Sequence, residues 1–502
     1  MSLVFSCAKQ LLASLPWQPR TVAGTGIAAD LALRSLCCDS RRAGEDSLFV
    51  CIRGAQSDGH HYILSAYEAG CRCFLVERLP DVALPPDAYL FLSDNTHRDL
   101  AYLAAAFYGY PAREMTIVGI TGTKGKTTVA MLCHTIAQQA GIPSGYIGTC
   151  GVRYGEVKKQ TNNTTPGALE LQQYLYEMRQ AGVQTVFLEV SSQALWQHRV
   201  DGIPFTAVAM TNLTPDHIGT HEHPDFDHYM ACKRRLLTEF GAPVVILNAD
   251  DSLVDRMGEH LKATVVRCGI RRAADLRATD LCHHTQNGLP GVAFIYRNAT
   301  RNIPVFLPLP GEHNVFNALF ALAITDALGI RAETAVAALA QATVPGRFEM
   351  IRFKEGLIVI DYAHNGAALR AALNTLRTYA PHRLLCLVGS VGERTQCRRT
   401  ELGAAASDLA DFTYLTADDP GFENVVDICR DMAQAFEDDR RYRIIPDRAE
   451  AICTALDELC AGDILLLAGK GDEQFQKIGN ARIPHSDRAV VEAYTATIST
   501  PV

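Results

Sequence analysis

Residues 119–128 read GITGTKGKTT, a glycine-rich stretch that ends in a lysine and two threonines. A β-branched run, TIVGIT (116–121), leads into it, and KTTVAMLCHTIAQQAG (126–141) has the apolar spacing of a helix that Gly141 is predicted to cap. A strand, a glycine-rich turn and a helix N-terminus together direct backbone N–H groups at an anion. The stretch therefore predicts a phosphate-binding loop in an α/β fold.

The loop predicts a nucleotide rather than a reaction. The strict phosphate-loop pattern requires glycine where the chain has Ile120, so the working form runs from Gly122 to Thr128. We expect Lys126 to neutralise phosphate charge and Thr127 to place a hydroxyl on Mg²⁺. The chain lacks the N-K-x-D of GTPases and the L-S-G-G-Q of ABC ATPases, which leaves ATP with another acceptor. A glycine-rich turn without a ligand is the alternative, and the flanking strand and helix disfavour it.

The length, charge and composition of the chain predict a multidomain protein of the cytoplasm. Its 502 residues exceed one compact core, and a net charge of −8 without a Lys/Arg-rich run disfavours nucleic acid or an anionic membrane as the main partner. No apolar run approaches the roughly 20 residues of a membrane span, and the first 20 residues indicate an amphipathic helix rather than a signal peptide. Sixteen cysteines without C-x-x-C predict reduced, mostly buried thiols.

Two proline-containing joints, at 108–115 and 341–350, predict three domains. We place these domains at 1–111, 112–343 and 344–502. Apolar runs alternate with helical stretches in the second and third domains, as in mostly parallel sheets. The expected strands are 116–121, 183–190, 206–211 and 243–248 in the second domain, and 357–362, 383–389, 411–416 and 463–469 in a Rossmann-like third domain.

Glu189 lies near the end of the expected strand 183–190. Ligands of such sheets gather at the carboxyl ends of the strands, where a carboxylate can reach the Mg²⁺ that a phosphate loop holds. A carboxylate buried on a strand without such a partner would be costly. We therefore expect Glu189 to act together with the loop.

Six further segments accompany the loop in order along the chain: NNTTP (162–166), EVSSQALWQHRVDG (189–202), TNLTPDHIGTH (211–221), GEHNVFNALFA (311–321), PGRFE (345–349) and DYAH (361–364). With the loop, they resemble the Mur ligases. The N-terminal DSR (39–41) and GAQSDGHHY (54–62) are similar to the members that add the third residue of the peptidoglycan stem peptide. The resemblance implies an N-terminal UDP-binding α/β domain, a central P-loop ATPase-like parallel sheet and a C-terminal Rossmann-like domain.

The resemblance also implies an activity and its substrates. Such ligases use ATP to phosphorylate a carboxylate of UDP-N-acetylmuramoyl-L-alanyl-D-glutamate, and the amine of an amino acid then attacks the acyl phosphate. The expected partners are these three small molecules, and we expect a monomer. Because the site brings two anions together, catalysis should depend on cations and positioning.

The family's ATP and metal positions carry over residue by residue. The ATP-binding positions are Gly122, Thr123, Lys124, Gly125, Lys126, Thr127, Thr128, Asn317, Arg347 and Asp361, and His364 joins Arg347 among the catalytic residues. Thr127, Glu189, His217 and Lys233 match the Mg²⁺ ligands, with Lys233 carbamylated by CO₂. Alone, His217 reads as a structural hydrogen bonder and Lys233 as an unmodified lysine on a helix surface.

The resemblance assigns a second set of positions to the UDP-muramoyl dipeptide. This set comprises Cys38, Ser40, Ala55, Gln56, Ser57, Asn163, Thr164, Thr165, Ser191, Gln197 and Arg199. Arg199 would supply charge for an anion, and the hydroxyl and amide groups would give direction. Loop capping is the alternative role of Thr164 and Thr165.

The third domain carries the positions that match the incoming amino acid: Arg394, Asp418, Asp419, Pro420, Gly421, Gly469 and Glu473. Diaminopimelate-adding members usually read D-N-P-R where this chain has DDPG (418–421). Gly421 offers no guanidinium for a distal carboxylate, and the two aspartates favour a cationic side chain. We therefore expect L-lysine. L-ornithine and diaminopimelate stay open, because Arg398 or Arg399 could replace the missing guanidinium.

Two other functions compete with this hypothesis. One is another ligase on the same scaffold, such as a folylpolyglutamate or cyanophycin-type synthetase, which the N-terminal DSR and GAQSDG segments disfavour. The other is a non-catalytic Mur-like binding subunit. Such a subunit should lose Lys126, Glu189, His217 or Lys233, and all four are present.

Overall fold

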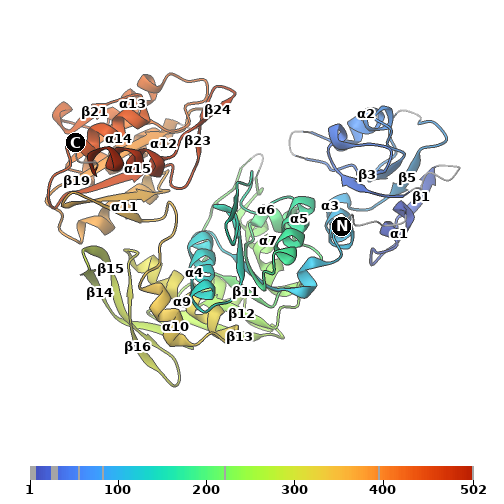
Figure 1. Cartoon of the computed structure of the whole chain (residues 1–502), viewed down its shortest axis with the longest axis horizontal. Coiled ribbons are helices and arrows are strands. Elements are labelled where there is room, and N and C mark those ends of the chain that lie inside the picture. Colours follow the sequence, from blue (N-terminus) through green and yellow to red (C-terminus); the bar gives the residue numbers. More distant parts are fainter. Residues whose placement is uncertain are drawn as a thin grey trace. The chain divides into compact units, whose positions relative to one another are not determined.

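A computed structural model of the chain describes residues 7–23, 32–54, 57–81, 84–219, 222–393 and 396–499 (Figure 1). The chain forms two compact units. The first comprises Met1–Leu276 and Leu319–Ala335, and the second comprises Arg277–Ala318 and Val336–Val502. The chain passes between them after Leu276 and again within α9 (Glu312–Ala327) and α10 (Ala332–Leu339).

The first unit begins with a five-stranded sheet of order β1-β5-β4-β3-β2, in which only β1 is antiparallel to its neighbour. Strands β3 and β4 are buried along their whole length, so they read as continuous apolar runs rather than as alternating ones. The elements of this part are α1 (Ala8–Leu12), β1 (Arg20–Ala23), β2 (Ser35–Cys37), β3 (Ser47–Val50), α2 (Ile63–Glu68), β4 (Cys73–Val76), β5 (Tyr89–Leu92) and α3 (Thr96–Phe107).

A second sheet of the first unit has the order β13-β12-β11-β6-β10-β7-β8-β9. Its strands are parallel except β8 and β9, which return antiparallel. The strands are β6 (Thr116–Thr121), β7 (Ser144–Gly148), β8 (Gly151–Tyr154), β9 (Val157–Lys159), β10 (Thr185–Glu189), β11 (Ala207–Met210), β12 (Val244–Asn248) and β13 (Thr264–Gly269). The helices are α4 (Lys126–Gln139), α5 (Ala168–Gln180), α6 (Ser192–Trp196), α7 (Phe226–Thr238) and α8 (Ser252–Arg256).

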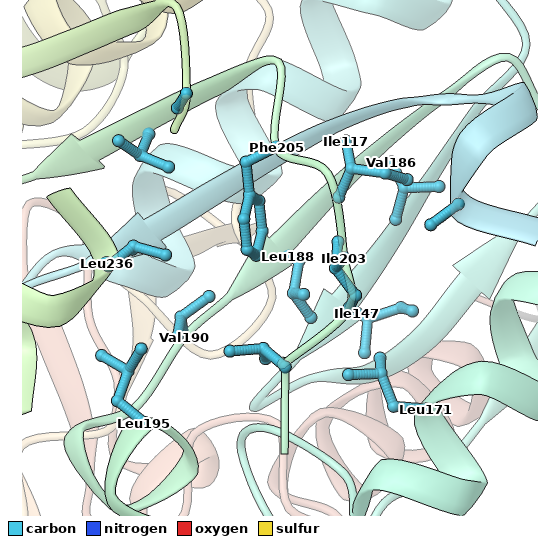
Figure 2. Packing of buried hydrophobic residues seen from close by; sticks show 14 of the residues in the cluster. Ile117, Ile147, Leu171, Val186, Leu188, Val190, Leu195, Ile203, Phe205 and Leu236 are labelled. Atoms are coloured by element: carbon cyan, nitrogen blue, oxygen red, sulfur yellow. The ribbon is translucent and has the colours of Figure 1, made fainter. Parts of the chain in front are cut away.

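The main core of the first unit lies between this sheet and helices α5, α6 and α7, whereas α4 covers the opposite face (Figure 1). Figure 2 shows Ile117, Val186 and Leu188 of the strands packed with Phe205. At Gly119 a Cβ atom would lie 2.8 Å from the Phe205 ring, so β6 needs glycine for this ring to reach the sheet. Close packing of this kind fixes the position of β6, and the glycine-rich loop continues directly from its last residue.

The second unit contains a mostly parallel sheet of order β17-β18-β22-β19-β20-β21, with β17 as the antiparallel edge. It also contains the antiparallel strands β14, β15 and β16 and the hairpin of β23 and β24. The strands are β14 (Leu276–Gln286), β15 (Leu289–Arg297), β16 (Asn302–Leu307), β17 (Glu349–Phe353), β18 (Gly356–Asp361), β19 (Leu384–Ser390), β20 (Phe412–Ala417), β21 (Tyr442–Ile444), β22 (Ile464–Ala468), β23 (Phe475–Ile478) and β24 (Ala481–Pro484). The helices are α11 (Gly366–Arg377), α12 (Gln396–Leu409), α13 (Val425–Ala433), α14 (Arg448–Asp457) and α15 (Asp487–Ser499).

The predicted α/β alternation is confirmed, and each expected strand overlaps an observed one. All sixteen cysteines are free and ten of them are buried, as predicted. Within the described ranges, no helix combines the length and apolarity needed to cross a membrane. The antiparallel strands β8, β9 and β14 were not predicted, because they are short or largely exposed and carry no apolar run. The domain boundaries at 111 and 343 stay predictions.

A fully buried ion pair connects two strand ends of the second unit. The Arg448 guanidinium donates to both carboxylate oxygens of Asp487, at 2.7 and 2.6 Å, and both side chains are fully buried. The same guanidinium donates to the carbonyls of Ala417 (3.2 Å) and Ala468 (2.9 Å), the last residues of β20 and β22. The pair therefore holds the ends of two strands at a set separation.

Replacing Asp487 by Ala should lower the free energy of unfolding of the second unit by about 3–5 kcal/mol, because it leaves a buried guanidinium without its carboxylate. Far-UV circular dichroism during urea unfolding should measure this loss of stability. Tryptophan fluorescence would not, since both tryptophans, Trp17 and Trp196, lie in the first unit. Asp438→Ala, which breaks the exposed pair with Arg440, is the matched control and should change nothing measurable. Equal stability of the two variants would contradict a structural role for the buried pair.

Candidate functional site

The glycine-rich loop joins β6 to α4 and is held by the segment that follows β11. The Lys124 backbone N–H donates to the Asn212 side-chain oxygen at 2.9 Å, and Thr211 and Asn212 donate to the Lys124 carbonyl at 2.6 and 3.0 Å. Gly122 and Gly125 have φ angles of +140° and +89°. A Cβ at Gly122 would lie 2.0 Å from the Thr211 hydroxyl oxygen, so the loop needs glycine there for this close approach.

The first turn of α4 directs its side chains toward the loop and toward β10. The Lys126 ammonium donates to the carbonyls of Gly122 (2.9 Å) and Thr123 (3.1 Å). The Thr127 hydroxyl donates to Glu189 Oε2 at 3.0 Å. Thr128 is buried on the same turn. The structure thus brings Thr127 and Glu189 together, as the sequence predicted.

Glu189 ends β10 with its carboxylate fully buried, and polar groups surround it. Tyr146 donates to Oε1 at 2.5 Å, and the Thr149 backbone N–H donates to the same oxygen at 3.0 Å. The Thr149 hydroxyl donates to Oε2 at 3.3 Å. Tyr146 and Thr149 were not predicted, because Tyr146 lies in the middle of β7, whose sequence SGYIG carries no continuous apolar run, and Thr149 follows that strand.

Lys233 on α7 is 1 % exposed, and its ammonium donates to the Gly122 carbonyl at 2.8 Å. The alternative of a lysine on a helix surface is therefore wrong. Burial, assisted by the charge of Lys126, lowers the pKa of Lys233 well below its usual range. This lysine therefore reaches its neutral, nucleophilic form at a lower pH than an exposed lysine does.

His217 lies on the loop between β11 and α7, with a φ of +56°. Its side chain is 52 % exposed, and its Nδ1 lies 3.1 Å from Glu222 Oε1. The neighbouring Asp216 pairs with Lys124 of the phosphate loop at 3.2 Å. The His217 loop is thus tied to the phosphate loop, while the imidazole itself faces solvent.

The positions assigned to the UDP-muramoyl dipeptide gather in part beside Glu189. Thr165 donates to the Glu189 carbonyl at 2.8 Å and accepts from the Ser191 backbone N–H at 3.0 Å. Arg199 donates to the Thr165 carbonyl at 2.7 Å and to the Gln197 side-chain oxygen at 2.6 Å. This arrangement leaves Thr165 buried in loop contacts, in line with the capping alternative.

The remaining positions of that set are more scattered. Thr164 contacts the Thr149 hydroxyl at 3.1 Å, and Asn163 is exposed. Ser40 begins a short 3₁₀ turn after β2, Cys38 lies just before that turn, and Ser57 donates to the Tyr62 hydroxyl at 3.4 Å. The other two members, Ala55 and Gln56, lie outside the described residues.

In the second unit, Asp361 ends β18 and accepts from the Phe348 backbone N–H at 2.9 Å. Burial raises its pKa, although Arg347 opposes the shift. Arg347 lies over the Tyr362 ring at 4.3 Å, and the His364 ring meets the same tyrosine edge-on at 4.8 Å. A separate contact joins Asn317 to the Asn314 side-chain oxygen at 3.0 Å.

Asp418, Asp419 and Glu473 surround a lysine that sequence analysis missed. The Lys470 ammonium is fully buried and lies 2.8 Å from Asp419 and 2.5 Å from Glu473. Burial works against its charge, but Asp418 and Glu473 raise the pKa of Lys470. Gly469 has a φ of +108°, and a Cβ there would lie 2.9 Å from the Asp418 carboxylate. The signal for Lys470 was the GKG within residues 469–471.

Gly421 follows the buried Pro420 with a φ of +59°, and a Cβ there would lie 2.7 Å from Glu393 Oε2. Arg399, one of the two arginines considered as replacements, is buried and donates to Glu423 (2.6 Å) and Asp431 (2.8 Å). Arg399 is therefore already paired with two carboxylates of its own unit. Arg394 lies outside the described residues.

The residues near the phosphate loop fit Mg²⁺ chemically. The Thr127 hydroxyl and the Glu189 carboxylate share one hydrogen bond, and oxygen donors are what Mg²⁺ prefers. Lys233 is a misfit as an ammonium and a match only as a carbamate, which carries a carboxylate-like charge. The geometry can therefore support phosphoryl chemistry on an anionic substrate.

Three family models match the chain: the Mur ligase family catalytic domain over residues 33–108, the Mur ligase middle domain over 120–325 and the Mur ligase glutamate ligase domain over 346–471. The chain is 33 % identical over 466 residues to the UDP-N-acetylmuramoyl-L-alanyl-D-glutamate–2,6-diaminopimelate ligase of Caldanaerobacter subterraneus subsp. tengcongensis, covering 92 % of this chain and 95 % of the relative. It is 36 % identical over 482 residues to the enzyme of that name from Chlorobaculum tepidum, covering 93 % of each. A solved structure of a ligase with that name aligns over 99 % of both chains with a TM-score of 0.69 at 25 % identity.

Tyr146→Phe should weaken the site around Glu189, because it removes one donor to a buried carboxylate and the acceptor of the Cys150 backbone N–H at 3.1 Å. We expect the first unit to lose about 1–3 kcal/mol of unfolding free energy and Mg²⁺-dependent ATP binding to weaken roughly tenfold. Tryptophan fluorescence and calorimetry measure the two effects. Tyr154→Phe on the neighbouring β8 is the matched control and should leave ATP binding unchanged. An ATP affinity that is equal in both variants would show that Tyr146 does not organise the site.

Proposed function

This chain belongs to the Mur ligase family and is therefore a ligase of peptidoglycan synthesis, and we propose that it joins a diamino acid to the D-glutamate of UDP-N-acetylmuramoyl-L-alanyl-D-glutamate. The observation that carries the proposal is the grouping of Lys126, Thr127, Glu189 and Lys233 around one loop. A binding module without catalysis has no need for a buried lysine whose pKa is lowered beside a phosphate loop.

The proposed reaction has two steps. A D-glutamate carboxylate oxygen attacks the γ-phosphorus of ATP, ADP leaves, and an acyl phosphate forms. The neutral amine of the amino acid then attacks the acyl carbon, a tetrahedral intermediate expels phosphate, and the nitrogen loses a proton. In our proposal, the backbone N–H groups of the loop and the Lys126 ammonium offset the charge that accumulates on the phosphates.

Thr127, Glu189, His217 and carbamylated Lys233 would hold Mg²⁺, which supplies positive charge to the phosphoryl oxygens when bound. The carbamate forms when the neutral Lys233 amine attacks CO₂, which creates an N–C bond and releases one proton. The low pKa and burial of Lys233 support this modification, because the ammonium cannot react and a buried cation is costly. Carbamylation would thus change Lys233 from a cation that repels Mg²⁺ into an anion that binds it.

L-Lysine is the first candidate for the added residue. Position 421 is glycine, with the Glu393 carboxylate next to it, and the three carboxylates around Lys470, those of Asp418, Asp419 and Glu473, outnumber its single ammonium. This surrounding charge favours a terminal ammonium over a terminal carboxylate. Arg399 is paired with Glu423 and Asp431, so it does not serve as a substitute guanidinium in this arrangement.

A second candidate is meso-diaminopimelate, because the relatives described above are named as 2,6-diaminopimelate ligases. These relatives are 33–36 % identical to this chain, so the site that reads the side chain can differ from theirs. The two candidates differ in one distal carboxylate. The choice is therefore decided by charge at the far end of the amino acid.

An amino-acid panel tests the function directly. With ATP, Mg²⁺ and the UDP-dipeptide present, we expect prompt phosphate release with L-lysine and at least about tenfold lower kcat/KM with diaminopimelate and L-ornithine, the difference that about 1.4 kcal/mol produces. Preference for diaminopimelate would overturn the lysine assignment but retain the ligase. Absence of turnover with every amino acid would favour the binding-module alternative.

A pair of variants at position 421 extends the panel. Gly421→Arg should lower kcat/KM for lysine roughly tenfold, because a second cation repels the terminal ammonium. Gly421→Ala is the matched control, since it imposes the same strain at a φ of +59° without the charge. If both variants lose lysine use equally, backbone strain is responsible and the side chain at 421 does not face the amino acid.

The carbamate on Lys233 predicts a dependence on CO₂. Removal of CO₂ should lower turnover, bicarbonate should restore it, and ¹³CO₂ should give a carbamate carbon signal that Lys233→Met abolishes. The neutral amine fraction rises with pH, so the CO₂ concentration needed for half-maximal activity should fall as the pH rises toward the lowered pKa of Lys233. Lys262→Met removes an exposed lysine and should keep the signal. A carbamate signal that survives Lys233→Met would refute the assignment.

A further inference from the structure

Three potential metal ligands that the proposed reaction does not use lie together on α7 and the loop before it. They are His223, His228 and Cys232, and their ligand atoms all lie within 4.8 Å of one another. His228 and Cys232 are one helical turn apart, so they share a face of α7. His223 precedes the helix and is fully buried, and Cys232 is 5 % exposed.

The distances within the cluster approach those of a tetrahedral site. Nδ1 of His223 lies 2.8 Å from Nδ1 of His228, which in turn lies 3.8 Å from Cys232 Sγ. Around one Zn²⁺, with metal–nitrogen and metal–sulfur bonds of about 2.0 and 2.3 Å, two nitrogens lie about 3.3 Å apart and a nitrogen and a sulfur about 3.5 Å apart. These two separations are thus within about 0.5 Å of the values a bound ion requires, and the third pair, His223 and Cys232, lies within 4.8 Å.

The groups around the cluster orient its ligands. His223 Nε2 lies 2.8 Å from the Ser192 hydroxyl, a contact that leaves Nδ1 to face His228. Outer hydrogen bonds of this kind fix the ring and the tautomer of metal-binding histidines. Asp225 accepts from the His228 backbone N–H at 2.7 Å and caps α7.

Aromatic rings pack against the two histidines. The Trp196 ring lies 5.4 Å from the His223 ring and meets the His228 ring edge-on at 4.9 Å. The Tyr229 ring lies 5.2 Å from the His223 ring. An enclosed thiol with two imidazoles differs from an exposed cysteine that collects metal by chance.

We propose that His223, His228 and Cys232 bind one divalent transition metal of the Zn²⁺ class, with water as the fourth ligand. Nitrogen and sulfur donors select such an ion, whereas three of the four ligands proposed for Mg²⁺, Thr127, Glu189 and carbamylated Lys233, offer oxygen, so the two sites favour different ions. The backbone N–H of His223 donates to the His217 carbonyl at 3.0 Å, and Lys233 directly follows Cys232. The bound metal therefore links the loop that carries His217 to α7, the helix that carries Lys233.

Co²⁺ is the probe, because a tetrahedral site with a thiolate gives visible bands and a sulfur-to-metal charge-transfer band. Titration of the full chain without ATP or substrate should saturate at one Co²⁺ per chain with both signals. This readout is independent of ligase activity, so its failure and that of the proposed function are distinguishable. Absence of the sulfur band at one equivalent would overturn the proposal.

Three variants locate the site. Cys232→Ser should abolish the sulfur band, and His228→Asn should weaken Co²⁺ binding at least about tenfold while keeping a residual band. Ser192→Ala should weaken binding roughly tenfold, as expected for a positioning residue. Circular dichroism of the metal-free variants checks that they fold. If Cys232→Ser does not fold, the His228→Asn variant tests the site, since His228 is half-exposed.

The matched control is the exposed run Cys282, His283 and His284 on β14, which offers the same ligand types without enclosure. Cys282→Ala should leave the sulfur band intact, and its loss there would overturn the proposal. In a Trp17→Phe background, Co²⁺ should quench the fluorescence of Trp196, and Cys232→Ser should weaken that quenching. Quenching that Cys232→Ser leaves unchanged would also contradict the site.

Discussion

The first unit depends on one buried carboxylate, that of Glu189. A carboxylate without water must be satisfied by donors, or it costs several kcal/mol. The donors come from Tyr146 on β7, from Thr149 in the turn after β7 and from Thr127 in the first turn of α4. Three elements are therefore fixed around one side chain, and the phosphate loop between β6 and α4 is positioned as a result.

Parallel sheets explain why the functional side chains gather at strand ends. In the first unit, Gly122, Glu189 and Thr211 stand at or just after the ends of β6, β10 and β11, which pair parallel in neighbouring positions. In the second unit, Asp361 and Asp418 stand at the ends of β18 and β20 in the same way. The carboxyl edge of each sheet is where loops with different sequences meet, so each unit has a polar edge over an apolar core.

Burial distinguishes the two lysines near the phosphate loop. Lys126 lies in the glycine-rich motif, and its place at the N-terminus of α4 follows from the sequence. Lys233 lies on a helix beside two arginines, and only the packing of α7 against the loop makes it a buried amine with a lowered pKa. Lys470 is buried as well, but three carboxylates around it keep its charge. Identical side chains thus acquire different chemistry from their surroundings.

The sequence by itself determined the α/β alternation, the strand before the loop, the glycine positions and the pairing of Thr127 with Glu189, because each follows from a local pattern or from the rule that parallel strands end together. It did not reveal Tyr146, Lys470 or the cluster of His223, His228 and Cys232. The four-residue spacing of His228 and Cys232 on α7 is local, but the approach of Tyr146 to Glu189 and of His223 to α7 is set by strand order and helix packing, which no periodicity along the chain records. Tertiary structure decided which polar side chains lost water together, and desolvation is what gives such groups their altered reactivity.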